Sequence, residues 1–175
     1  ERTVADALAR LPLRRPALPV PNGSLLAGLR VLEETPAFHP VAGWVDLRDP
    51  ARTLAEITAA FARVYLRRPS VGFAHMITGP AALRSLAPHL DEQSLCAATR
   101  HAWQLAAGLY VVYGDPRAPE SDGRPAPREA LVSACIANGG AHSIKLTEAC
   151  LREEALTGDP ILLAAARDAG EKMRG

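Results

Sequence analysis

The sequence predicts an all-α protein, a compact array of about eight helices joined by proline-rich connectors. Alanine and leucine are plentiful along the 175 residues, and runs of β-branched residues are scarce. Apolar residues recur at intervals of three and four in most segments, which is the spacing of a buried helix face. No segment has a convincing strand pattern. We therefore expect one helical domain that covers residues 1–175.

The first 67 residues are expected to contain two short helices, followed by one long amphipathic helix. Short helices are expected at residues 1–11 and 23–35. Residues 12–22 carry four prolines and cannot form a helix interior, so they are expected to be an extended connector. Residues 36–50 are expected to form a loop. Residues 51–67 have a clear amphipathic pattern. Its apolar positions are Leu54, Ile57, Phe61, Val64 and Tyr65.

The remaining chain is mostly helical in pattern. Residues 69–90 are apolar, and we expect an interruption at Gly79-Pro80, because a proline removes a helix hydrogen bond. The longest uninterrupted helix is expected at residues 91–114. Residues 115–127 are rich in proline, glycine and charge, which predicts a flexible, solvated loop. Three more helices are expected at residues 128–138, 140–158 and 159–173.

The composition excludes several classes of function. The net charge of +1 gives no electrostatic footprint for nucleic acid. No apolar run reaches the roughly 20 residues of a membrane span. The three cysteines, Cys96, Cys135 and Cys150, have no CxxC spacing, which favours a reducing compartment over a disulfide framework. A cytoplasmic protein without a membrane or nucleic-acid partner is expected.

The helix at residues 140–158 contains an unusual polar pair. His142 and Lys145 fall on one stripe with Leu146 and Ala149, which is the spacing of a buried face. Burial lowers the pKa of a lysine, and a neutral amine can react with carbon dioxide to give a carbamate that binds a metal. Two plainer interpretations stay open. Lys145 could pair with Glu148 or extend to solvent, and His142 could be an ordinary histidine near a helix start.

A second histidine has a similar position. Val71, His75, Thr78, Ala82 and Leu86 lie on one stripe of the segment that contains Pro80. His75 could equally be a core histidine bonded to a backbone carbonyl. Together, two imidazoles and one carbamate oxygen would suit iron, zinc or manganese, with iron favoured for oxygen chemistry. His39, His89 and His101 are weaker candidates for ligands.

The predicted helix at 91–114 offers an aromatic face. Its members at helical spacing are Thr99, Trp103, Ala106, Tyr110 and Tyr113, beside the small residues Ala107 and Gly108. Such a face is either ordinary helix packing or the wall of a pocket for a flat aromatic ligand.

Three blocks of this sequence resemble the questin oxidase-like proteins. They are "FAHMITGPAALRSLAPHL" (73–90), "AWQLAAGLYVVYG" (102–114) and "AHSIKLTEACLRE" (141–153). The resemblance covers about the last two-thirds of the chain, and the third block is the most specific. Members of that family are helical enzymes of aromatic polyketide metabolism, and the namesake opens an anthraquinone ring oxidatively.

The resemblance implies a non-haem iron oxygenase that carries out a Baeyer–Villiger-type or dioxygenase cleavage. It implies that His75, His142 and a carboxylated Lys145 are metal ligands, with His142 and Lys145 at the catalytic centre. Glu148 and Thr78 would support these ligands, and Trp103 and Tyr110 would face the aromatic substrate. Members are about twice as long and have His-Gly motifs that this chain lacks, so it resembles their C-terminal half. The N-terminal half or a partner chain would supply the remaining ligands.

Other functions compete with an iron oxygenase. A metal-free, NADPH-dependent monooxygenase of the same substrate class is one, although the chain has no GxGxxG motif after a strand. A non-catalytic helical half that binds a partner chain through an apolar face is another. A hydrolase with carbamate-bridged metals would need more inward carboxylates than the pattern provides.

Overall fold

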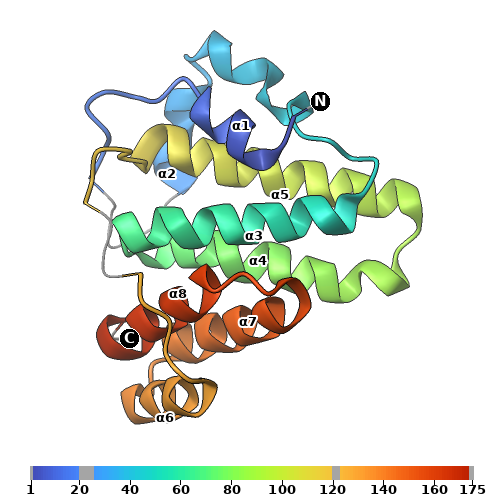
Figure 1. Cartoon of the computed structure of the whole chain (residues 1–175). Helices are drawn as coiled ribbons and strands as arrows, with labels where there is room; N and C mark the ends of the chain where they lie inside the picture. The colour runs from blue at the N-terminus through green and yellow to red at the C-terminus, as the bar shows by residue number, and fades with distance from the viewer. Residues whose placement is uncertain (1, 20–25, 120–122, 174–175) are drawn as a thin grey trace.

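The computed structural model describes residues 2–19, 26–119 and 123–173, and within these residues it contains eight α-helices and three 3₁₀ segments (Figure 1). The α-helices are α1 (Val4–Ala9), α2 (Leu26–Leu29), α3 (Pro50–Arg67), α4 (Val71–Leu86), α5 (Glu92–Tyr113), α6 (Arg128–Asn138), α7 (Ala141–Thr157) and α8 (Ile161–Lys172). The 3₁₀ segments are η1 (Arg30–Leu32), η2 (Pro36–Gly43) and η3 (Ala87–His89).

The all-α prediction is confirmed. The described residues contain no β-strand, and their single β-type contact is an isolated parallel bridge between Arg2 and Val45. None of the described helices combines the length and the apolar character that crossing a membrane requires.

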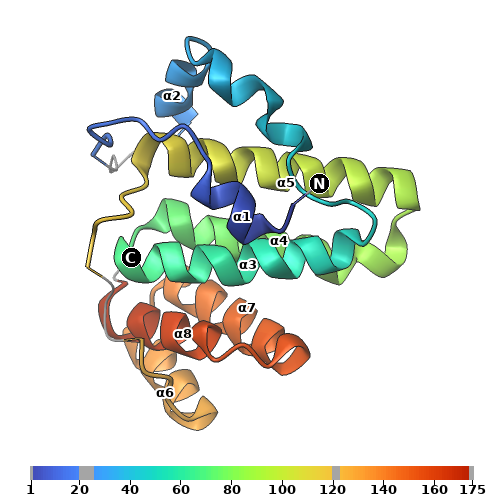
Figure 2. The same cartoon turned by 45° about the horizontal axis from the view of Figure 1, so that its top comes forward.

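The helices are stacked on both sides of the α3–α4 pair. α5 packs on one side of this pair, and α7 and α8 pack on the other, with α6 beyond them (Figures 1 and 2). α1 lies against α3, and α2, η1 and η2 lie against α5. The centre of the stack is apolar and includes Phe61, Ile77, Trp103, Leu146 and Leu162.

Side-chain caps explain where several helices begin. Asp49 accepts a hydrogen bond from the Arg52 amide at the start of α3, and Asp91 accepts one from the Ser94 amide at the start of α5. The hydroxyl of Ser70 accepts from the Phe73 amide at the start of α4. The predicted α3 and α5 therefore agree with the structure to within one residue at either end.

Glycine ends α6 and α7. Gly139 (φ +69°) and Gly158 (φ +71°) adopt the left-handed conformation just after these helices, where a side chain would be strained. The two α-helices end at Asn138 and Thr157, within one residue of the predicted ends at 138 and 158.

The predicted helix at 23–35 is wrong in extent. Residues 23–25 lie outside the described residues, and the rest divides into the one-turn α2 and η1. This segment is pressed against α5. A Cβ on Gly28 would lie 1.9 Å from the Tyr113 hydroxyl, and a Cβ on Gly108 would lie 3.0 Å from a Leu32 methyl. Packing on α5 therefore decides the local conformation here.

Two further expectations are corrected. Residues 36–43 are not a loop but the 3₁₀ segment η2, which begins at Pro36 and buries Phe38 and Val41. α4 is not interrupted at Gly79-Pro80 but continues to Leu86, with Pro80 buried inside it. The burial of Pro80 and Ala81 in the helix stack outweighs the hydrogen bond that the proline removes.

The predicted loop at 115–127 contains no helix in its described parts, residues 115–119 and 123–127. Residues 120–122 of this prediction lie outside the described residues.

Candidate functional site

The structure brings His75 and His142 together. Their rings lie with centroids 5.4 Å apart and planes at 77°, an edge-to-face arrangement. His75 comes from the first half of α4, and His142 comes from the first turn of α7, so residues far apart in the sequence meet at this point. The predicted pairing of these histidines is thus present in the fold.

The packing of α4 on α7 positions the two histidines. Near the far ends of these helices, the Arg84 guanidinium donates to the Glu153 carboxylate at 2.6 Å. The two helices therefore run in the same direction, because His75 meets His142 near their beginnings. Arg152 of α7 adds hydrogen bonds to the carbonyl of Ala81 at 3.0 Å and the hydroxyl of Ser85 at 2.6 Å on α4.

Glu153 is the polar centre of this contact. Its side chain is buried, and it accepts hydrogen bonds from both Arg84 and Arg152. A buried carboxylate is tolerated only when such partners satisfy it. The interpretation of the sequence did not include Glu153. Its place on the same stripe as Leu146 and Cys150, a charged residue on an apolar face, could have indicated a buried carboxylate.

The histidine pair lies at the surface rather than in the core. His75 is exposed and His142 is half-buried. The predicted inward stripe of α4 is wrong, because Val71 and Leu86 retain 39% and 53% of their accessible surface. α4 buries a different face, which includes Phe73, Ile77 and Ala81. α4 is apolar on more than one face, so periodicity alone did not identify the buried one.

Lys145 is exposed as well, which corrects the prediction that α7 faces it toward the protein. The buried side of α7 is formed by Ser143, Leu146, Thr147, Ala149, Cys150 and Glu153. The reasoning that burial would activate the Lys145 amine therefore does not hold. The charge of Lys145 still contributes to lowering the pKa of His75.

The two residues predicted to support the ligands have other surroundings. Glu148 accepts a hydrogen bond from the Arg152 Nε at 2.8 Å, so its carboxylate is engaged by arginine rather than by Lys145. Thr78 is half-buried on α4, one turn after His75.

The surroundings of His75 favour its neutral form. Desolvation, and then the nearby charges of His142 and Lys145, lower the pKa of His75 below its ordinary value of 6.5. A neutral imidazole has a free lone pair on one nitrogen, which is the form that binds metals.

The centroid distance of the pair is compatible with one shared cation and equally with an ordinary edge-to-face ring contact. Metal–imidazole bonds of about 2.0–2.1 Å place two ring centroids roughly 5 Å apart, close to the observed 5.4 Å. The described residues contain no group of three or more His, Cys, Asp or Glu side chains that could hold a metal. The described residues therefore offer two imidazole ligands at this point.

The predicted aromatic wall is not a single surface. Trp103 is fully buried, and its indole Nε1 donates to the carbonyl of Val41 at 2.7 Å. Trp103 is thus a core residue that fixes η2 on α5, and its side chain has no exposed surface in this structure for the predicted contact with substrate. Tyr110 is half-buried.

Tyr110 lines a cavity that is separate from the histidine pair. It closes an apolar groove of about 510 Å³ together with Leu8 of α1 and Ala60 and Val64 of α3. This groove lies over α3 on the α1 side, whereas the histidine pair lies between α4 and α7 (Figure 1). Sequence analysis did not identify the groove, because it forms only where α1 crosses α3.

The remaining histidines stay separate from this pair. His39 in η2, His89 in η3 and His101 on α5 are all exposed. The sequence rated them as weaker candidates, and the structure pairs none of them with His75 or His142 in a ring contact.

Comparison of the chain with models of protein families, with curated proteins and with solved structures found no match. The resemblance to questin oxidase-like proteins therefore stays a prediction.

Proposed function

We propose that this chain contributes two histidine ligands to the metal site of a non-haem iron oxygenase. Its substrate would be an anthraquinone-like aromatic polyketide, cleaved oxidatively with O2. The observation that carries the proposal is the 5.4 Å approach of the His75 and His142 rings from two different helices. The resemblance of residues 141–153 to questin oxidase-like proteins supports the choice of chemistry.

The residues of this chain would have distinct roles. His75 and His142 would hold the cation through neutral imidazole nitrogens, and the lowered pKa of His75 favours that form at neutral pH. Bound iron would supply Lewis acidity and reactivity with oxygen. The Lys145 amine, if it adds to carbon dioxide and releases one proton, would become an oxygen ligand on the same side of α7.

Additional ligands would come from outside the described residues. Two imidazoles do not complete a mononuclear site, and His75 is exposed beside the apolar Val71. This exposure is consistent with an N-terminal half or a partner chain that covers the pair. We expect a cytoplasmic location, in keeping with three free cysteines.

Metal titration tests the proposal. We expect the folded chain to bind one Zn²⁺ or, without oxygen, one Fe²⁺, measured by calorimetry. His75→Ala and His142→Ala should each weaken binding at least about tenfold, because each removes one of two ligands. His101→Ala is the matched control, since His101 is an exposed histidine on α5. Equal affinity in all four proteins would contradict the proposed site.

The pH dependence of binding is a second readout. Binding should weaken as the pH falls below the ordinary histidine pKa of 6.5, because protons compete for the imidazole nitrogens. Mass analysis of protein incubated with bicarbonate would show whether Lys145 carries the added carboxyl group, with Lys145→Arg as the control.

A non-catalytic half that binds a partner chain is the second candidate. The observation in its favour is the exposure of Val71 and Leu86 on the same helix as His75. A folded chain that binds neither metal ion would favour this function. Turnover of an anthraquinone by metal-stripped protein with NADPH would instead favour the metal-free monooxygenase.

A further inference from the structure

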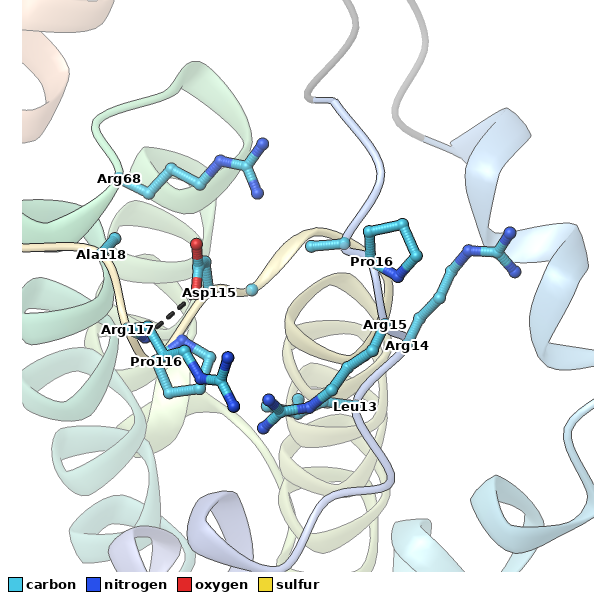
Figure 3. Close-up of a pocket in the computed structure, with 11 residues that line it drawn as sticks. Leu13, Arg14, Arg15, Pro16, Arg68, Asp115, Pro116, Arg117 and Ala118 are labelled. Carbon is cyan, nitrogen blue, oxygen red and sulfur yellow. Dashed lines mark hydrogen bonds between the residues drawn. The ribbon is translucent and has the colours of Figure 1, made fainter.

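Four arginines gather around one cavity close to where α3 and α5 end. The cavity has a volume of about 490 Å³, and its walls include Arg14, Arg15, Arg68 and Arg117. Figure 3 shows Arg68, Asp115 and Arg117 on one wall and Arg14, Arg15 and Pro16 on the other. Asp115 is the single carboxylate among the lining residues. We call this cavity the arginine pocket.

The wall that carries Arg14 and Arg15 is fixed to α5. The amide of Arg14 donates to the carbonyl of Val111 at 2.9 Å, and the amide of Leu18 donates to the carbonyl of Val112 at 2.9 Å. Both carbonyls belong to the last turn of α5. The proline-rich connector is therefore held in place by main-chain hydrogen bonds.

The opposite wall is fixed as well. The Asp115 carboxylate accepts from the amide of Arg117 at 3.0 Å, which closes a tight turn (Figure 3). The Arg67 guanidinium donates to the carbonyl of Pro116 at 3.0 Å. Arg68 joins the two walls, because its guanidinium donates to the carbonyl of Tyr113 and, at 3.2 Å, to the carbonyl of Leu18. The pocket is thus preformed, which reduces the entropic cost of binding a ligand.

Three of the four guanidinium groups are free to bind a ligand. Within the part of the chain that the structure describes, the side chains of Arg14, Arg15 and Arg117 form no hydrogen bond or ion pair, and all three residues are exposed. Arginine stays protonated at any physiological pH. Several unpaired cations around one cavity repel each other, and an anion between them would remove that repulsion.

The helix ends nearby do not account for this charge. α3 and α5 both end at this corner, and a helix C-terminus attracts cations with about half an elementary charge. However, the amides of Arg14 and Leu18 already satisfy carbonyls at the end of α5, and Arg68 satisfies another. The guanidinium groups of Arg14, Arg15 and Arg117 are left over after these contacts.

We propose that the arginine pocket binds a small organic phosphate. The planar guanidinium group matches the oxygen atoms of a phosphate, and arginines on two facing walls can contact a diphosphate from both sides. The lining also includes the apolar residues Leu13, Pro16, Ala17, Pro116 and Ala118. They give the organic part of the ligand a surface to pack on, and the volume lies within the range of small-molecule sites.

Calorimetric titration with adenosine diphosphate, pyrophosphate, inorganic phosphate and citrate tests this inference on the full chain. We expect saturable binding of the two diphosphates and weaker binding of inorganic phosphate, because one phosphate reaches fewer arginines. Adenosine diphosphate should bind at least as tightly as pyrophosphate. Citrate that binds as tightly as adenosine diphosphate would overturn the assignment of phosphate as the ligand group.

Charge-neutralising variants locate the binding. Arg15→Gln and Arg117→Gln should each weaken pyrophosphate binding about tenfold, the effect of losing a charge-assisted hydrogen bond. Arg100→Gln is the matched control, because Arg100 is an exposed arginine on α5 that does not line the pocket. Equal weakening in all three variants, or no binding by the parent protein, would overturn the inference. Removal of an exposed side chain should leave the fold intact, and circular dichroism checks this.

Discussion

The behaviour of single residues in this protein follows from how far each side chain is buried. Lys145 and His75 reach solvent, while Trp103, Cys150 and Glu153 lie within the helix stack. A titratable side chain changes its pKa mainly through lost hydration and nearby charge.

We expect His75 to make the folded state sensitive to mild acid. Its pKa is lowered in the fold by desolvation and by the charges of His142 and Lys145. The unfolded chain then binds a proton more readily than the folded chain, so stability is full above pH 6.5 and falls as the pH drops through that value. His75→Gln should show a shallower loss of unfolding free energy between pH 7.5 and 5, measured by urea denaturation. His101→Gln is the control, and identical pH slopes for parent and His75→Gln would contradict the cause assigned here.

Cys150 should resist thiol reagents in the native protein. Burial, and then the charges of Glu153 and Glu148, raise the pKa of its thiol, so the reactive thiolate is scarce. Cys96 is only half-buried and should react first with iodoacetamide. Mass spectrometry of labelled peptides measures both rates. Labelling of Cys150 as fast as Cys96 would show that the core opens more readily than the packing implies.

At the scale of elements, the contact between α4 and α7 fixes the candidate metal site. The histidine pair lies near the beginning of these helices and the Glu153 contacts lie near their ends. If the helices slid past each other by one turn, one imidazole would shift by about 5.4 Å along the helix axis relative to the other. The arginine contacts to Glu153 therefore control the geometry of the histidines.

Glu153→Ala should destabilise the protein strongly. It leaves the partly buried Arg84 without its carboxylate, and removal of one partner of a buried ion pair costs about 3 kcal/mol. Glu148→Ala, on the exposed side of α7, should cost less than about 1 kcal/mol. Chemical denaturation measures both changes. The same experiment with zinc should show weaker metal binding in Glu153→Ala. If Glu153→Ala lowers the unfolding free energy no more than Glu148→Ala does, Glu153 does not have the structural role given to it here.

At the scale of the whole molecule, one arginine joins three segments. Arg68, just after α3, bonds to the end of α5 through Tyr113 and to the connector through Leu18. Leu13 and Leu18 of the connector are only partly buried against the core, so these hydrogen bonds add to its stability. Arg68 thereby holds together the arginine pocket and the N-terminal part of the chain.

Arg68→Ala should release the connector. We expect trypsin to cleave after Arg14 several-fold faster in this variant, because the two lost hydrogen bonds contribute about 1–3 kcal/mol of local stability. Arg63→Ala is the control, since Arg63 lies on α3 and pairs with Asp159 instead. Limited proteolysis followed by mass spectrometry measures the rate. Equal cleavage in both variants would show that the connector is held by other contacts.

Local sequence signals predicted the all-α class and the long helices α3, α5, α7 and α8. These features depend on local periodicity, on capping residues such as Asp49 and Asp91, and on glycines that end helices. Such signals act over a few residues, so they can be read along the chain. The sequence grouped His75 with His142 only as candidate ligands of one metal, and their approach depends on the packing of α4 on α7.

The packing of the helices decided which faces of α4 and α7 are buried, whereas the face of α3 that is buried is the one its apolar pattern predicts. α4 has apolar residues on more than one side, and the packing of α3 and α7 chose the side with Phe73 and Ile77 over the side with Val71 and His75. Packing also placed Trp103 in the core, turned residues 36–43 into η2 and assembled the arginine pocket from segments remote in sequence. These outcomes depend on the fit of several elements to one another, and the free energy of that fit has no local signature in the sequence.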